Sequence, residues 1–213
     1  IQLPFHVFLF SGASAVGKTA VLKSLLPLLD QSGESPCVCK IDCLQSKDAV
    51  TFQKNEIIPA VTGLSGDICP DHFLVSNLPE LWQWTDAMQR NLLVIETAGL
   101  CHRCSPATKH MLAGCVVDCT VSCKAPGQLG PMLTQADFVV LTKVDMISQA
   151  EMEIICWQIG QINPQAKNFP LLMLLPVMVL TYWHNGYLPN PAIWTLLRIH
   201  CGTQCPVVCA PTA

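Results

Sequence analysis

The strongest constraint on the fold is a motif near the amino terminus that matches the phosphate-binding pattern G-x-x-x-x-G-K-[ST]. Its members are Gly12, Ala13, Ser14, Ala15, Val16, Gly17, Lys18 and Thr19. An apolar run over residues 6–11 precedes the motif, and apolar residues at helical spacing follow it over residues 18–29. In this context the loop amides and the helix N-terminus form a nest for phosphate oxygens, Lys18 adds a positive charge, and the Thr19 hydroxyl binds Mg²⁺. The motif therefore predicts a nucleoside triphosphate site, and the alternative is a chance match in a glycine-rich turn.

Four more apolar runs follow along the chain and predict the fold class. They cover residues 37–42, 92–96, 115–118 and 138–142. The runs are continuous rather than alternating, which is typical of strands that helices cover on both faces. Helix-length segments separate them, as in βαβ units. We expect an α/β fold of the P-loop NTPase type, with a mostly parallel central sheet and helices on both faces.

Composition excludes several classes of protein and divides the chain in two. Of the 213 residues, 51% are hydrophobic and 13% are charged, so most of the chain has enough apolar material to fold. The net charge of −3 argues against a nucleic-acid partner. No apolar run reaches the ~18 residues of a membrane span, and no export signal is visible, so we expect a cytoplasmic protein.

We assign residues 1–167 to the nucleotide domain. Residues 168–213 carry only one charged side chain, Arg198, and are either a last strand with an apolar tail or a sequence artefact.

An acidic residue at a strand end completes the phosphate site. The apolar run 92–96 ends in Glu96, and Gly99 follows three residues later. An acid at the end of a strand beside the phosphate loop is suited to hold the Mg²⁺ shell. The Gly99 amide is placed to contact the γ-phosphate and to report whether that phosphate is present. The alternative is a strand that ends in a solvated glutamate.

The segment after the run 138–142 predicts the choice of base. Residues 142–145 read Thr-Lys-Val-Asp. The Lys143 stem can stack on a purine, and the Asp145 carboxylate can accept two hydrogen bonds from the guanine edge, which adenine does not offer. The usual form of this motif begins with Asn, and here Thr142 takes that place. The alternative is an ordinary helix start with Asp145 as a capping acid.

The chain has 13 cysteines, and the absence of an export signal predicts reduced thiols rather than a disulfide framework. Two segments combine thiols with imidazoles: Cys69 with His72, and Cys101 with His102 and Cys104. These ligands suit Ni²⁺ or Zn²⁺, and a site shared across a two-fold axis needs only two or three of them from each chain. The alternative is buried thiols and solvated imidazoles. The other cysteines in and near the predicted strands are expected to pack in the core: Cys37, Cys39, Cys43, Cys115, Cys119, Cys123 and Cys156.

Together these motifs resemble the nickel-insertion GTPases of the HypB/UreG group, within the SIMIBI class of P-loop proteins. The resemblance covers residues 5–167. In that family the Mg²⁺-linked acids lie in an E-x-x-G motif, which residues 96–99 match, and after the second strand, where residues 41–49 line up and place Asp42 in that role. The family's metal-binding Cys–His pair is similar to residues 66–72, although Asp71 is inserted before His72, and its later cysteine is similar to residues 101–104.

The resemblance implies a function. It implies a slow, Mg²⁺-dependent GTPase in which Lys18, Asp42 and Glu96 are the catalytic residues and Arg103 is a candidate arginine finger. Hydrolysis would drive a nucleotide- or metal-dependent homodimer that delivers nickel or a similar metal to a client metalloenzyme or its maturation factors. Two alternatives stay open: a non-catalytic, nucleotide-gated metal sensor or adaptor, and an ATP-dependent Fe–S or metallocluster scaffold.

Overall fold

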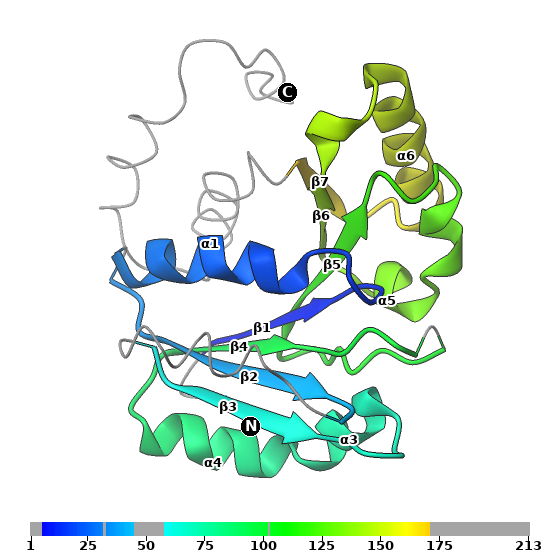
Figure 1. Cartoon of the computed structure of the whole chain (residues 1–213). Helices are drawn as coiled ribbons and strands as arrows, with labels where there is room; N and C mark the ends of the chain where they lie inside the picture. Colours follow the sequence, from blue (N-terminus) through cyan, green and yellow to red (C-terminus); the bar gives the residue numbers. More distant parts are fainter. Residues whose placement is uncertain (1–5, 32, 45–57, 102, 171–213) are drawn as a thin grey trace.

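The computed structural model describes residues 6–31, 33–44, 58–101 and 103–170, and predictions made for other residues lie outside it. These residues form a seven-stranded sheet in the order β3-β2-β4-β1-β5-β6-β7, and every described ladder is parallel (Figure 1). The strands are β1 (His6–Ser11), β2 (Pro36–Asp42), β3 (Ala60–Leu64), β4 (Leu92–Glu96), β5 (Leu112–Asp118), β6 (Phe138–Thr142) and β7 (Lys167–Pro170). The α-helices are α1 (Lys18–Gln31), α3 (Pro70–Ser76), α4 (Leu78–Ala87), α5 (Pro131–Thr134) and α6 (Gln149–Ile162), with short 3₁₀ turns η1 (Ala125–Gln128) and η2 (Val144–Met146).

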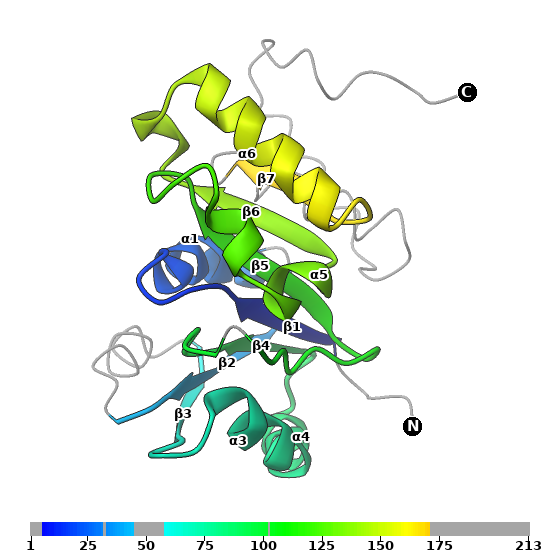
Figure 2. The same ribbon diagram turned by 90° about the vertical axis from the view of Figure 1, so that its right-hand side faces the viewer.

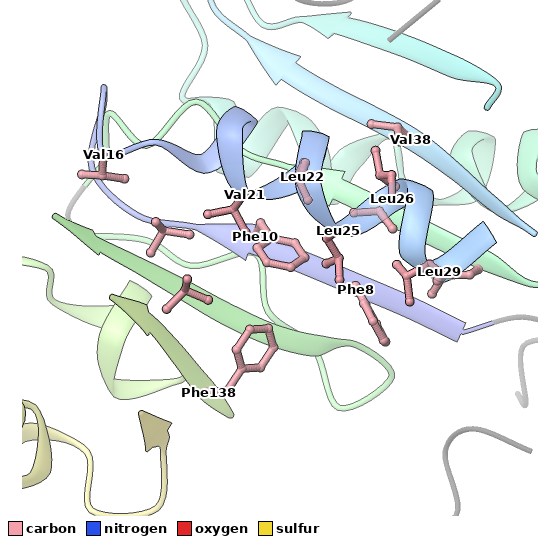
Figure 3. Packing of buried hydrophobic residues seen from close by; sticks show 14 residues of the cluster. Phe8, Phe10, Val16, Val21, Leu22, Leu25, Leu26, Leu29, Val38 and Phe138 are labelled. Carbon is pink, nitrogen blue, oxygen red and sulfur yellow. The ribbon is translucent and has the colours of Figure 1, made fainter. Parts of the chain in front are cut away.

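Helices cover both faces of the sheet, as the sequence predicts. Alternation along β1 sends Phe8 and Phe10 toward α1, where they pack with Leu22 and Leu25 (Figure 3). The neighbouring side chains of β1 point to the opposite face, into a core shared with α3 and α4. Helices α5 and α6 cover that same opposite face over β5 and β6. Figure 2 accordingly shows α1 on one side of the sheet and α5 on the other. The P-loop NTPase type of α/β fold is confirmed.

The five predicted strands are all present, and the main differences lie at the edges of the sheet. Strand β3 was not predicted because it is a half-buried edge strand of five residues, with Thr62 and Gly63 breaking the apolar run. Strand β5 begins at Leu112, before the predicted start at residue 115. Strand β7 pairs with β6 at the other edge and begins at Lys167, and the chain after residue 170 lies outside the described part. Among the described residues, no helix is long and apolar enough to cross a membrane.

The cysteines in the strands pack in the core, as predicted, and no described cysteine is in a disulfide. The three in strands, Cys37, Cys39 and Cys115, are buried, and so is Cys119, which directly follows β5. Burial raises the pKa of Cys39 and of Cys115 to about 12, so these thiols stay protonated at neutral pH. Three others that were expected in the core are only half-buried: Cys43, Cys123 and Cys156.

The parallel topology decides where a ligand binds. Because all the strands run in one direction, their carboxyl ends meet at one edge of the sheet, and ligands of open α/β sheets bind outside that edge. The phosphate motif follows β1, and the acids Asp42 and Glu96 end β2 and β4. The fold therefore brings these predicted site segments to a common edge.

Candidate functional site

The phosphate motif forms a tight loop between β1 and α1 that only certain residues permit. Gly12 has φ of 133°, and a Cβ atom there would lie 2.4 Å from the carbonyl oxygen of Val116 on β5. A larger residue at this position would therefore displace the loop from the sheet. Ala15, at the tip of the loop, also has a left-handed backbone, with φ of 62°. The loop is thus bent into the concave shape that presents successive backbone N–H groups to an anion.

Lys18 is enclosed by the loop that precedes it. Its Nζ atom donates hydrogen bonds to the carbonyl oxygens of Gly12, at 2.9 Å, and Ala13, at 2.7 Å. Only 6% of the residue is exposed. Burial lowers the pKa of Lys18, an effect that Glu96 opposes and Lys40 reinforces. The structure thus places a buried ammonium group at the N-terminus of α1, where the sequence predicts phosphate binding.

Thr19 and Glu96 are two of the three residues that the sequence assigns to Mg²⁺, and they are in direct contact. The Thr19 hydroxyl donates to Oε1 of Glu96 at 2.7 Å. Glu96 is 3% exposed, and its Oε2 atom has no hydrogen-bond partner among the described residues. A buried carboxylate oxygen without a partner is costly unless a cation or donor satisfies it. Hard oxygen donors are the ligands that Mg²⁺ prefers, so these residues fit that ion.

Lys40 is a third member of this group, and the sequence analysis did not identify it. It lies on β2 directly beside Glu96 of β4 in the sheet register. Its Nζ atom is 3.2 Å from Oγ1 of Thr19 and 3.5 Å from Oε1 of Glu96. The available signal was a lysine within an otherwise apolar run, two residues before Asp42 and so on the same face of the strand.

Asp42 ends β2, and no described side chain contacts its carboxylate. The Oδ1 atom accepts a hydrogen bond from the backbone N–H of Cys43 at 2.9 Å. Its negative charge raises the pKa of Lys18, although burial and other charges outweigh this effect. Asp42 therefore lies near the phosphate loop, and its role toward Mg²⁺ stays a prediction.

Gly99 joins the phosphate loop to the segment that follows β4. Its backbone is left-handed, with φ of 73°, and a Cβ atom there would lie 1.9 Å from the carbonyl oxygen of Gly12 and 2.8 Å from Nζ of Lys18. Only glycine fits so close to the loop. The backbone N–H of Thr97 also donates to the carbonyl oxygen of Phe10 on β1 at 3.0 Å. Gly99 therefore lies against the phosphate loop at the start of the segment that leads to Cys101.

Three thiols lie close together in the structure, and two of them, Cys101 and Cys104, follow Gly99 in the chain. The sulfur atoms of Cys69, Cys101 and Cys104 all lie within 4.8 Å of one another, and all three residues are half-buried. Cys69 precedes α3, and its loop is fixed to the end of β2 by the backbone N–H of Ser65, which donates to the carbonyl oxygen of Asp42 at 2.9 Å. Three thiolates at this spacing match the ligand number of a metal site that keeps one position open.

Two of the three thiols, Cys101 and Cys104, differ in acidity. The backbone N–H of Arg103 lowers the pKa of Cys101, and hydrogen bonds from the thiols of Cys104 and Cys69 lower it further. The pKa of Cys104 is raised to about 11, chiefly by its hydrogen bond with Cys101. Cys101 is therefore the first of the pair to become a thiolate, and the thiolate is the form that binds metal.

Of the two predicted imidazole ligands, the one that the structure describes, His72, is not part of this cluster. His72 is exposed on α3, three residues after Cys69, and is not among the cluster's members. The inserted Asp71 is buried instead. His102 lies outside the described residues, and Arg103 is exposed. Sequence spacing placed Cys69 with His72, whereas the structure places Cys69 with the thiols that follow β4.

The base motif is linked to the phosphate loop through Thr142. Its hydroxyl oxygen is 2.9 Å from the carbonyl oxygen of Val16, which accepts its hydrogen bond. The hydroxyl that replaces the usual Asn thus provides a direct side-chain link between the two motifs. Asp145 is exposed in η2. Its contact with guanine stays a prediction.

Lys143 is held by an acid that the sequence analysis did not single out. Lys143 has a left-handed backbone, with φ of 56°, and forms an ion pair with the carboxylate of Asp118 at the end of β5. The backbone N–H and the hydroxyl of Thr120 also donate to Asp118. Burial alone would raise the pKa of Asp118, but the bonds from Lys143 and Thr120 outweigh it and lower the pKa. The signal was the same as for Glu96, an acid that ends an apolar strand.

Comparisons with known proteins agree with this geometry. The family model described as CobW/HypB/UreG, nucleotide-binding domain, matches residues 6–170. An uncharacterized protein of Methanocaldococcus jannaschii is 45% identical over 161 residues, which cover 76% of this chain and 68% of that protein. The urease accessory protein UreG of Trichodesmium erythraeum is 27% identical over 150 residues, covering 63% of this chain and 68% of that protein.

Solved structures resemble the fold. The crystal structure of HypB from Helicobacter pylori in complex with nickel superposes with a TM-score of 0.68 at 18% identity, covering 87% of this chain and 90% of that chain. The hydrogenase maturation factor HypB from Archaeoglobus fulgidus gives a TM-score of 0.58 at 19% identity, covering 78% of this chain and 81% of that chain. At these identities the likeness establishes the fold.

Proposed function

This chain belongs to the CobW/HypB/UreG family of nucleotide-binding domains, and on that premise we propose that it is a GTP-hydrolysing metallochaperone. In this proposal it binds GTP with Mg²⁺, hydrolyses it slowly, and uses the change to deliver a transition metal to a client metalloenzyme. The metal is cargo, and Ni²⁺ and Zn²⁺ are the two candidates. The relatives support this class of function, since they include a urease accessory protein and a HypB that was crystallised with nickel.

One observation carries the proposal. Gly99 lies against Gly12 and Lys18 of the phosphate loop, and Cys101 is only two residues further along the chain. A segment so short cannot absorb a displacement at Gly99 without moving Cys101. Binding of the γ-phosphate and binding of the metal cargo would therefore both depend on the few backbone torsions between Gly99 and Cys101. Each ligand would then change the affinity for the other, and this is the coupling that a nucleotide-driven carrier needs.

The chain's own residues supply the elements of phosphoryl transfer. The loop amides and Lys18 would hold the β- and γ-phosphates and stabilise the charge that develops on them. Mg²⁺ would be held by Thr19, Asp42 and Glu96, and its charge would neutralise that of the phosphates. Glu96 would also orient the attacking water, which adds to the γ-phosphorus as the bond to the β-phosphate oxygen breaks and GDP and phosphate form. Asp145 and Lys143 would select guanine.

The thiol cluster would hold the cargo and release it by ligand exchange. Half-buried sulfurs on loops leave one side of the metal open to a ligand from another protein. That ligand would come from a second copy of this chain in a nucleotide- or metal-dependent homodimer, or from the client enzyme or its maturation factors. Free thiols at the surface persist in a reducing compartment, which favours the cytoplasm. Neither nucleic acid nor a membrane is needed in this scheme.

Phosphate release and metal equilibrium dialysis test the proposal together. We expect slow GTP turnover that Glu96→Gln abolishes, and metal binding that Cys101→Ser and Cys104→Ser abolish. Cys156→Ser is the matched control, because that thiol is also half-buried but lies on α6, away from the cluster.

If GTP binds without any turnover, the protein is a nucleotide-gated sensor or adaptor and the enzymatic part is wrong. Tighter binding of ATP than of GTP, with a brown iron chromophore, would identify a metallocluster scaffold instead.

A further inference from the structure

Lys40 is a buried cation that the scheme above does not use. It is 7% exposed, and lysines are almost never buried without an ionic partner. Its position is fixed by the sheet, because β2 pairs with β4 so that Lys40 lies beside Glu96. The alternation of β2 directs Lys40 to the face that α1 covers, and Thr19 is in the first turn of that helix.

The ammonium group contacts the same two oxygens that fit Mg²⁺. Its Nζ atom is 3.2 Å from Oγ1 of Thr19 and 3.5 Å from Oε1 of Glu96. A Mg²⁺ ion bound to the Thr19 hydroxyl would lie about 2.1 Å from that oxygen, and hence within about 5 Å of the ammonium. Two cations at that separation repel each other, and solvent screens them little because both Lys40 and Glu96 are buried.

We propose that Lys40 is a built-in cation that shares Thr19 and Glu96 with Mg²⁺ and sets how strongly nucleotide binding depends on that ion. This inference rests on the proposed function. Lys40 supplies one positive charge to the phosphate site permanently. The site therefore holds a nucleoside diphosphate in the absence of Mg²⁺ better than a site of the same shape with a neutral residue. For the same reason it binds Mg²⁺ more weakly, since the ion must enter beside a fixed charge.

A purely structural ion pair is the competing explanation, and the two make different predictions. If Lys40 only stabilises the sheet, its replacement lowers stability and weakens nucleotide binding equally with and without Mg²⁺. If Lys40 acts as a site cation, its replacement weakens nucleotide binding in the absence of Mg²⁺ and strengthens the binding of Mg²⁺ itself. The proximity of Lys40 to Lys18, whose pKa it helps to lower, is consistent with a charge that reaches the phosphate loop.

The test is a titration of fluorescent GDP, and of a non-hydrolysable GTP analogue, in EDTA and over a range of Mg²⁺ concentrations. The variants are Lys40→Met and Lys40→Gln, which remove the charge, and Lys40→Arg, which keeps it. Lys23→Met is the matched control, since Lys23 is an exposed lysine of α1, four residues after Thr19. Circular dichroism and thermal unfolding show whether each variant is folded, and Lys40→Gln retains a hydrogen-bond donor in case Lys40→Met does not fold.

We expect both neutral variants to lose about tenfold or more of their GDP affinity in EDTA and to need several-fold less Mg²⁺ for half-saturation. Lys40→Arg should restore wild-type behaviour in part, and Lys23→Met should equal the wild type. Equal losses in both conditions, or no change in Mg²⁺ dependence, would overturn the inference and leave the proposed function intact. Absence of nucleotide binding in the wild type would instead overturn both.

Discussion

Two corners of the molecule meet at the carboxyl edge of the sheet, and they are built in different ways. The phosphate corner comprises residues 12–19 with Lys40 and Glu96. Its charged side chains are buried and are held by hydrogen bonds and an ion pair. Lys18, Lys40 and Glu96 are 6%, 7% and 3% exposed. Lys18 donates to the carbonyl oxygen of Gly12 within the loop, and Lys40 on β2 contacts Thr19 and Glu96 from two other segments. The thiol corner, which comprises Cys69, Cys101 and Cys104, consists of half-buried side chains on loops whose sulfurs are close mainly to one another.

The difference indicates a division of labour. The phosphate corner is preorganised by strands and a helix, as a site that stabilises developing charge must be. The thiol corner depends on loops, which change conformation at lower cost. Gly99 joins the two, because its backbone contacts the phosphate loop and leads directly into the thiol segment. A nucleotide would bind to the rigid phosphate corner, and the conformation of the thiol corner would change with the nucleotide that is bound.

The largest expected effect comes from the phosphate corner. Lys18→Ala removes the buried ammonium from the nest, and nucleotide affinity should fall by about 100-fold or more, since charge-assisted contacts to phosphate are among the strongest in proteins. Metal stoichiometry should be unchanged, because the thiol corner does not contain Lys18. Calorimetric titration with GDP and dialysis with Zn²⁺ measure the two effects. Equal loss of both ligands would mean that the corners are one folding unit rather than two sites.

The reciprocal change is Cys101→Ser in the thiol corner. Serine is a poor ligand for a thiophilic metal, so we expect metal affinity to fall by about 100-fold while GDP affinity changes little. A competition titration with a chromophoric chelator gives the metal affinity. Cys39→Ser is not a suitable comparison because that thiol is buried in the core, whereas Cys156→Ser should behave as the wild type. Metal binding that survives in Cys101→Ser would show that the three-thiol assignment is wrong.

The acidity of the thiols gives a smaller effect with a definite sign. The pKa of Cys101 is lowered and that of Cys104 is raised to about 11, so Cys101 forms a thiolate at lower pH than Cys104. In metal-free protein, iodoacetamide should modify Cys101 at least about tenfold faster than Cys104 at pH 7.5. The Cys101 rate should reach its plateau at a lower pH than the Cys104 rate, which should keep rising toward pH 11. Mass spectrometry of initial rates measures both, and the reverse order would contradict the assigned hydrogen bonding.

The smallest effect concerns the link between the base motif and the phosphate loop. Thr142→Val keeps the shape but removes the donor to the carbonyl oxygen of Val16, so a buried acceptor loses its partner. We expect the free energy of unfolding to fall by about 1–3 kcal/mol and nucleotide affinity to fall a few-fold. Urea unfolding measures the first and GDP titration the second. Thr134→Val, at an exposed threonine, is the control, and an identical result for both variants would rule out the link.

Most residues of the phosphate corner could be found in the sequence because they belong to local patterns. Its loop is a contiguous motif, and its acid, Glu96, ends a continuous apolar strand. Lys40 was missed because its role depends on strand pairing, which brings it beside Glu96 across the sheet. Strand β3 was missed because a half-buried edge strand has no continuous apolar run.

The thiol corner was predicted only in part because it is assembled from distant segments. Spacing identified Cys69, Cys101 and Cys104 as candidates, but it also suggested His72 as the partner of Cys69. Which of these ligands converge depends on how the loops after β3 and β4 fold against each other. The structure places the three sulfurs together and leaves His72 exposed on α3. No pattern in a single sequence encodes that contact.

The most direct test of the coupling through Gly99 is the metal dissociation constant measured twice, once with GDP and once with a non-hydrolysable GTP analogue, both with saturating Mg²⁺. Linkage requires that if the γ-phosphate changes metal affinity, the metal changes nucleotide affinity by the same factor. We predict that the two constants differ by about fivefold or more, and that the metal shifts the relative affinity for GDP and the analogue by the same factor. Identical constants in the two nucleotide states would contradict the account, because the two corners would then be independent.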